Sequence, residues 1–195
     1  TKEAFEKTIA EKKALISEKT SFGEFAWHCS EIIANTHCSH TNMGSFYFEG
    51  NMLPLSLRFP IHTRWIDQKL YVVDPYNNGH LVKVKDEIIS INGLSVATLM
   101  QEMYKHIPAQ GYIKTTKSHF FNTWSTAIIP YAMGFPLEYE IVVRGKNQPI
   151  ILQKADKIRE PFRDPTIKKC ENGLCLEFLD NQKTAILTIA TFNYY

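Results

Sequence analysis

The first third of the chain begins with apolar positions at helical spacing. Residues 2–18 read as an amphipathic surface helix, with lysines and glutamates around an apolar face at Phe5, Ile9 and Ile16. A second helix is expected from Ser21, because Ser21 and Glu24 have the spacing of a capping box, and it should end near Asn35. The two helices should pack as a helical hairpin.

From Ser45 the apolar period changes to two, which is typical of half-buried strands. Three or four short strands are expected over residues 46–72, with inward side chains at Phe46, Phe48, Leu53, Leu55, Leu57, Phe59, Leu70 and Val72. Later strands are expected at 87–91, 137–143, 150–153, 174–179 and 184–189. The chain therefore passes from helices to a sheet, and the fold class is α+β.

Two more helices are expected among these strands. Ser95 can cap a helix that Pro108 stops, with an apolar face at Val96, Leu99, Met100, Met103 and Ile107. Another helix should run from about Ser118, bend at Pro130 and end at Gly134.

The segment 154–169 is charged, contains Pro161 and Pro165 and has no clear period, so it is the best linker candidate. We therefore expect three parts: a helical region at 1–45, a β-rich domain at 46–153, and a third part at 154–195. Residues 184–190 look like a buried strand, and only 191–195 follow. We expect the sequence to be a truncated piece of a longer protein.

Charge and composition exclude some classes of function. The 22 basic and 20 acidic residues leave a net charge of +2, without a long basic block, so nucleic acid is an unfavourable partner. No apolar run approaches the roughly 20 residues that cross a bilayer, and the N-terminus lacks the apolar core of a signal peptide. Any export signal must have been removed.

Four cysteines fit an oxidising compartment. Between Cys170 and Cys175, the pair Asn172-Gly173 favours a tight type I′ turn, which would oppose the two cysteines closely enough for a disulfide. The alternative is two reduced thiols. Cys29 and Cys38 offer a second bridge with less geometric support.

The segment 85–96, KDEIISINGLSV, resembles the strand, Asn-Gly turn and helix at the centre of PDZ domains. The segment 137–145, LEYEIVVRG, is similar to the later PDZ strand that ends in arginine. Lys85 stands where the usual glycine would be, and residues 111–134 contain an extra helix.

These segments occur together with the helical hairpin, a His-Thr pair at 40–41 and the final strand. In this combination the chain resembles the front half of the tail-specific, or C-terminal processing, serine peptidases and their tricorn-like relatives. The resemblance implies a PDZ-like domain that presents a peptide or unfolded protein substrate, followed by a catalytic α/β domain. It implies a secreted, periplasmic or envelope-anchored protein without a cofactor. The nucleophilic serine would come later, because no serine here lies in a Gly-x-Ser-x-Gly turn, so this segment alone should be inactive.

His40 resembles the histidine of this family's Asp-x-His-Thr motif, which in the tricorn-like branch is the general base. The preceding acidic residue is absent, since Cys38 and Ser39 stand in its place. The alternative is a histidine that only bonds to backbone at a helix-to-strand corner. A zinc site at Cys29, His37, Cys38 and His40 has compatible residue types but no Cys-x-x-Cys pair, so no metal is expected.

A PDZ-like sheet edge would bind a peptide by strand addition. The candidate for holding the peptide carboxylate is Asn78, Gly79, His80 and Leu81, where Gly79 would permit the turn that aims N–H groups at the anion. A plain surface turn is the alternative. Two other functions stay open: a non-catalytic PDZ-like peptide-binding module, and a zinc-dependent regulator.

Overall fold

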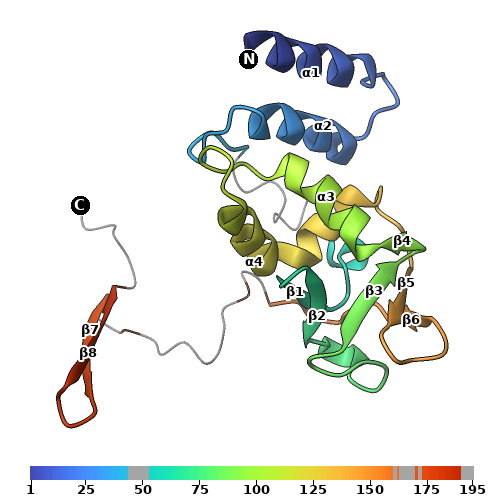
Figure 1. The fold of residues 1–195 in the computed structure, drawn as a ribbon. Coiled ribbons are helices and arrows are strands. Elements are labelled where there is room, and N and C mark those ends of the chain that lie inside the picture. The colour runs from blue at the N-terminus through green and yellow to red at the C-terminus, as the bar shows by residue number, and fades with distance from the viewer. Residues whose placement is uncertain (44–52, 160–161, 163–169, 171–172, 190–195) are drawn as a thin grey trace. The chain divides into compact units, whose positions relative to one another are not determined.

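A computed structural model describes residues 1–43, 53–159, 162, 170 and 173–189 (Figure 1). The chain divides into two compact units, Thr1–Phe162 and Arg163–Tyr195. Their division falls within the expected linker, most of which lies outside the described residues.

The expected helical hairpin is present as α1, Lys2–Ala14, and α2, Phe22–Ala34. Ser21 and Glu24 form the full capping box at the start of α2. Lys12 of α1 pairs with Glu31 of α2 at 2.5 Å, and α1 buries none of its residues. The helix α2 lies between α1 and α3 (Figure 1) and is buried at Ala26, Ser30 and Ala34. It therefore joins the hairpin to the rest of the first unit.

An antiparallel sheet forms the other layer of this unit, in the order β1-β2-β3-β5-β6, with the short β4 also paired to β3. The strands are β1 His62–Ile66, β2 Lys69–Asp74, β3 Glu87–Ile91, β4 Leu94–Ser95, β5 Tyr139–Val143 and β6 Ile150–Leu152. Asp67 and Gln68 both have positive φ, 48° and 61°, and connect β1 to β2. Among the described strands β1 pairs with β2 alone, so it is an edge strand.

The segment from β3 to α3 follows the expectation closely. Asn92 and Gly93 take positive φ in the turn, and Ser95 accepts a hydrogen bond from the N–H of Thr98 to cap α3, Val96–His106. The apolar face of α3 packs on the sheet, so that β3 and α3 share one core. Its largest fully buried members are Phe59, Phe121, Ile61, Leu70, Ile88, Ile91, Leu99, Met103, Ile128, Ile129 and Ile141.

The helix α4, Lys114–Ala132, begins four residues before the predicted start near Ser118. Backbone angles at Trp124 (φ −128°, ψ 28°) kink it, and Pro130 lies inside it. A proline has no N–H for the carbonyl four residues earlier. That carbonyl, of Thr126, instead accepts a hydrogen bond of 2.9 Å from the N–H of Phe59. The helix is therefore joined to the segment that leads into β1.

The strand predicted over 53–59 is wrong. Leu55–Leu57 is a single 3₁₀ turn between Pro54 and Arg58, in which the N–H of Leu57 bonds to the carbonyl of Pro54. Proline fixes its own φ and cannot donate to a ladder, and Leu53 and Phe59 reach the core without a strand. The strand predicted at Phe46 and Phe48 lies outside the described residues.

The second unit contains the antiparallel ribbon of β7, Leu174–Leu179, and β8, Thr184–Ile189. Both strands have the predicted bounds. The expectation that 184–190 is buried is wrong for this unit, because Ile186 is 43% exposed and Leu187 is 60% exposed. Among the described residues, apolar side chains on both faces of the ribbon are exposed, as Leu176 and Ile186 show.

Within the described residues the protein is thus a mixed α+β structure of four α-helices and antiparallel strands, and the predicted class is confirmed at that level. Among the described helices, none has the length and apolar character to traverse a bilayer.

Asn78 is the fully buried polar connection between distant parts of the first unit. It ends the 3₁₀ turn Tyr76–Asn78 and is 0% exposed. Its Nδ2 donates to the carbonyls of Pro60 (3.2 Å) and Gln153 (2.9 Å), and its Oδ1 accepts from the N–H of Gln153 at 2.8 Å. One amide therefore fixes the chain before β1 and the chain after β6.

Replacing Asn78 by alanine should destabilise the first unit by about 3 kcal/mol, since it leaves buried backbone groups without partners. Urea unfolding followed by tryptophan fluorescence measures this, because Trp27, Trp65 and Trp124 all lie in that unit. The matched control is Asn77→Ala, which loses a single bond to the carbonyl of Lys154 and should cost about 1 kcal/mol or less. Equal losses in the two variants would contradict this account.

Candidate functional site

A pocket of about 370 Å³ lies between the end of β1 and the first turns of α3. We call it the β1–α3 cleft, and its lining residues are Trp65, Gln68, Ala97, Met100, Gln101, Tyr104 and Lys114. Ala97 and Gln101 are exposed and Met100 is buried, so the cleft is open to solvent with an apolar floor. A side chain of an extended peptide would fit its size and character.

The outer edge of β1, beside this cleft, is covered by side chains of α4. Asn122 accepts from the N–H of Trp65 at 2.6 Å through Oδ1 and donates to the carbonyl of Trp65 at 3.2 Å through Nδ2. Ser125 Oγ accepts from the N–H of Thr63 at 3.0 Å. These are the groups that an added strand would pair with, so the Asn122 amide occupies the position of a peptide unit.

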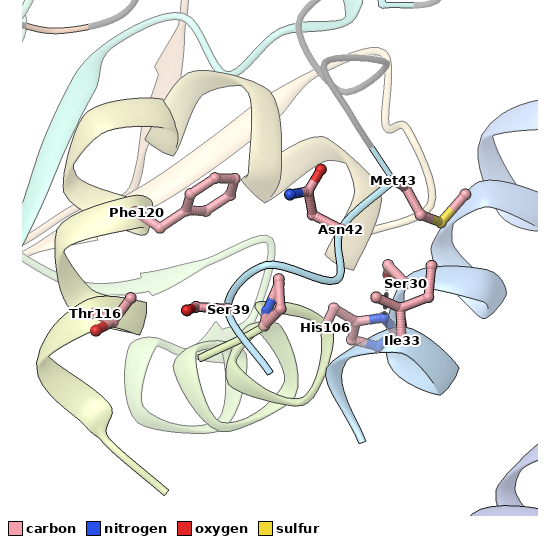
Figure 2. A pocket seen from close by; sticks show the side chains of 9 residues that line it. Ser30, Ile33, Ser39, Asn42, Met43, His106, Thr116 and Phe120 are labelled. Atoms are coloured by element: carbon pink, nitrogen blue, oxygen red, sulfur yellow. Dashed lines mark hydrogen bonds between the residues drawn. The ribbon is translucent and has the colours of Figure 1, made fainter. Parts of the chain in front are cut away.

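A second pocket, of about 280 Å³, lies among α2, α3, α4 and the loop after α2 (Figure 2). Its walls include Ser30, Ile33, Ser39, Asn42, Met43, His106, Pro108, Thr116 and Phe120. Figure 2 shows Ser30 and His106 side by side at one end of this pocket. A serine next to a histidine raises the question of a nucleophile.

The hydrogen bonds around His106 answer that question. Nδ1 of His106 lies 2.9 Å from the carbonyl oxygen of Trp27, which can only accept, so Nδ1 carries the proton. Ser30 Oγ is 2.9 Å from the same Nδ1 and donates its own hydrogen to the Trp27 carbonyl at 2.7 Å. The imidazole therefore presents a proton, and no lone pair, to the hydroxyl. Ser30 is not activated as a nucleophile.

Burial lowers the pKa of His106 to about 4, with the Glu31 carboxylate opposing part of that shift. Its ring also stacks on Trp27, with centroids 3.5 Å apart. The ring is thus neutral at pH 7, and its other nitrogen, Nε2, faces two carboxylates of α2 and α3.

The structure places His40 in the turn after α2, with its side chain exposed. Its neighbours Ser39 and Asn42 line the second pocket, but His40 is not among the lining residues. No serine hydroxyl of the described residues is hydrogen-bonded to the His40 ring. Its role as a general base stays a prediction.

The predicted anion-holding residues are not brought to the β1–α3 cleft. Gly79 has φ −61°, which any residue adopts, so the reason given for a glycine there is wrong. The N–H of Leu81 bonds back to the carbonyl of Asn78 at 2.9 Å, Asn78 has the structural role described above, and His80 is exposed. The anion-binding role stays a prediction that this geometry does not favour.

Cys170 and Cys175 form a disulfide with Cα atoms 5.6 Å apart. Gly173 takes φ 76°, and its N–H bonds to the carbonyl of Cys170 at 3.2 Å. This turn leads into β7, so Cys170 lies before the turn and Cys175 is the second residue of β7. Cys175 pairs across the ribbon with Thr188.

Cys29 and Cys38 are both free, so the second bridge is absent here. Burial raises the pKa of the Cys29 thiol, and a hydrogen bond from Thr41 lowers that of Cys38. His37 bonds through Nδ1 to the carbonyl of Gly111 at 3.2 Å. The Cys and His residues considered for zinc are not gathered in this structure. Among the described residues, three potential ligand side chains cluster at Glu31, Glu102 and His106 instead.

The sequence did not predict which side chains meet His106 and Trp65, two residues that line the two pockets. Glu102 and His106 do have the spacing that places two side chains on one helix face, a usable signal. Their meeting with Glu31, and that of Asn122 with Trp65, depends on how helices pack and has no local signal.

Comparison with known proteins finds no family model that matches the chain, and no curated protein that matches its sequence. The resemblance to tail-specific peptidases therefore stays a prediction that depends on the motifs given above.

His62, at the start of β1, is a buried histidine that reports on the contact between β1 and α4. It is 0% exposed, its Nε2 donates to the carbonyl of Asn122 at 2.8 Å, and its ring stacks on Phe162. Burial lowers its pKa to about 4. The hydrogen bond to the Asn122 carbonyl opposes that shift, and the charges of Arg64, which lowers the pKa, and Asp74, which raises it, have smaller effects.

A lowered folded-state pKa makes stability depend on pH. The unfolded chain binds a proton below about pH 6.5 and the folded chain only near pH 4. The contribution of His62 to the free energy of unfolding is therefore complete above pH 6.5. It falls between pH 6.5 and 4, by at most about 3 kcal/mol. His62→Gln keeps a donor for Asn122 without a titrating ring, so its thermal midpoint should fall less steeply over that range.

The control is His119→Gln, an exposed histidine of α4, which should keep the parent's slope. His106 contributes a slope of the same sign, so a residual slope remains in His62→Gln. A His62→Gln profile parallel to the parent's from pH 7 to 4 would show that His62 is not held neutral.

Proposed function

We propose that this chain binds extended peptide segments and presents them to a serine endopeptidase of the tail-specific type, whose nucleophile is not among these residues. The observation that supports the proposal best is the β1–α3 cleft. It lies between an edge strand and a helix that follows an Asn-Gly turn, and its volume is about 370 Å³. A PDZ-like domain binds its peptide at such an edge.

The peptide would lie along the outer edge of β1 and insert one apolar side chain above Met100. Main-chain bonds to Thr63 and Trp65 would replace those that Ser125 and Asn122 make now. This exchange conserves the number of hydrogen bonds to the strand, so its cost is the movement of two side chains or of the kinked helix that carries them. The proposed peptide site is therefore one that α4 occupies in the absence of peptide.

The second candidate is a peptide-binding module without catalysis. It is favoured by the completeness of the cleft within the first unit, together with the position of His40 outside the lining of both pockets. Peptide binding is common to both candidates. The two candidates differ in whether the bound peptide is then hydrolysed.

Peptide binding is tested with the 195-residue chain and a fluorescein-labelled ten-residue peptide of alternating apolar and polar residues, by fluorescence anisotropy. Ala97→Trp fills the cleft from an exposed position and should weaken binding at least tenfold. Asn122→Ala frees the N–H and carbonyl of Trp65 and should strengthen binding severalfold.

The matched control is Ala10→Trp, which makes the same change at an exposed position of α1. It should bind as the parent does. The peptide proposal fails if neither the parent nor Asn122→Ala binds, or if Ala97→Trp binds as tightly as Ala10→Trp.

The enzyme is tested with a fluorophosphonate probe that labels activated serines. The 195-residue chain should stay unlabelled and should cleave no unstructured peptide, whereas a protein from the same gene that carries the proposed catalytic domain should be labelled. Labelling of the 195-residue chain would reveal a nucleophile that this proposal lacks. An unlabelled longer protein that still binds peptide would support the non-catalytic module.

A further inference from the structure

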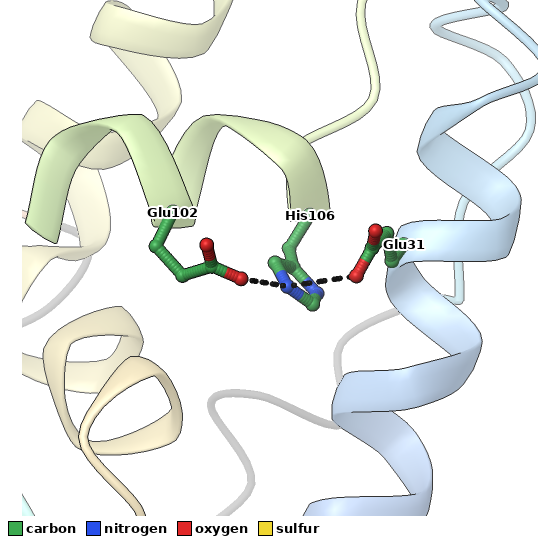
Figure 3. Close-up of side chains that lie close together, drawn as sticks. All are labelled: Glu31, Glu102 and His106. Atoms are coloured by element: carbon green, nitrogen blue, oxygen red, sulfur yellow. Dashed lines mark ion pairs between the residues drawn. The ribbon is translucent and has the colours of Figure 1, made fainter. Parts of the chain in front are cut away.

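Three side chains from two helices converge between α2 and α3 (Figure 3). Glu102 and His106 lie one turn apart on α3, and Glu31 faces them from α2. Nε2 of His106 is 3.5 Å from Oε2 of Glu31 and 3.5 Å from Oε1 of Glu102. Ligand atoms of a tetrahedral site with bonds of about 2.0–2.1 Å lie about 3.4 Å apart. The spacing around Nε2 therefore matches two edges of such a site.

The tautomer makes Nε2 a ligand atom. Because Nδ1 donates to the carbonyl of Trp27, the neutral ring has its lone pair on Nε2. An imidazole fixed by a backbone carbonyl at its other nitrogen is the arrangement that zinc-binding histidines adopt. The geometry around Trp27 thus orients His106 as a metal ligand would be oriented.

His106 also points to a missing partner. Its side chain is 2% exposed, and Nε2 makes no hydrogen bond of ordinary length among the described residues, since the two carboxylate oxygens lie 3.5 Å away. A buried lone pair that faces two carboxylate oxygens is unfavourable unless a cation lies between them. The buried Nε2 is therefore an observation beyond the acidic pair itself, and it favours a positive ion between the three ligand atoms.

The lysines nearby balance the carboxylates but do not reach Nε2. Lys12 lies 2.5 Å from Oε2 of Glu31, and Lys105 lies 2.6 Å from Oε2 of Glu102. The second of these leaves Oε1 of Glu102 available, whereas the first competes for the same oxygen that faces His106. A metal would have to displace Lys12, so the site should be weak while Lys12 is present.

We propose that Glu31, Glu102 and His106 bind a divalent transition-metal ion, with Zn²⁺ as the ion of choice. One imidazole nitrogen and two carboxylate oxygens form a mixed ligand set that suits Zn²⁺ and excludes Ca²⁺, which prefers oxygen alone. Glu102 is 41% exposed, so water can reach the remaining coordination position. The binding of zinc would join α2 directly to α3.

Zinc binding is measured by isothermal titration calorimetry on the 195-residue chain with Cys29→Ser and Cys38→Ser, since free thiols also bind zinc. One ion per chain should bind. Glu102→Gln should weaken binding at least tenfold, and Lys12→Gln should tighten it severalfold because the competing ammonium is gone. The control Glu138→Gln removes the same charge at an exposed position and should bind as the parent does.

The tightening by Lys12→Gln distinguishes a metal site from a structural histidine, which gives no reason for a gain. A second readout is the ¹⁵N chemical shift of His106 Nε2, which should move on addition of Zn²⁺ in the parent and stay fixed in Glu102→Gln. The proposal is overturned if the cysteine-free chain binds no zinc, or if Glu102→Gln binds it as tightly as Glu138→Gln. Neither result bears on peptide binding at β1.

Discussion

The backbone of an edge strand must find partners, and the structure of the first unit depends on how β1 meets that requirement. An unpaired strand edge is a template for another strand, and a buried unpaired N–H costs about 1–3 kcal/mol. Here α4 supplies the partners: Asn122 pairs with both polar groups of Trp65, Ser125 accepts from Thr63, and the Thr126 carbonyl accepts from Phe59. Three positions along one helix thus pair with backbone groups of Phe59, Thr63 and Trp65.

Helix α4 can do this because it is not regular. The kink at Trp124 separates Asn122 from Ser125, and Pro130 releases the Thr126 carbonyl from the bond it would make within a helix. A straight helix would bond its own carbonyls internally and would present side chains at a different spacing to the strand. The kink and the proline in α4 therefore provide hydrogen-bond partners for the backbone in and before β1.

Elements with a local chemical signal could be predicted, and the others could not. Asn92 and Gly93 accept positive φ and Ser95 caps α3, so the passage from β3 to α3 follows from the sequence. The start of α4 has no such signal, since Ile113 offers no side-chain cap, and its first turn was missed. The alternating leucines at 53–57 imitate a strand, although Pro54 and the 3₁₀ turn determine the backbone there. The contacts of Glu31 with His106 and of Asn122 with Trp65 could not be predicted either, because they form only after the helices have packed.

Phe162 has a consequence for whatever follows it in the chain. Its N–H bonds to the carbonyl of Thr123 at 3.0 Å, and its ring stacks on His62 with centroids 4.1 Å apart. The last residue of the first unit is thus anchored on α4 and β1, the two elements between which the proposed peptide would bind. A force on the chain after Phe162 would act on the contact between α4 and β1. Such a force and the binding of a peptide at the edge of β1 would therefore be coupled through the side chain of Phe162.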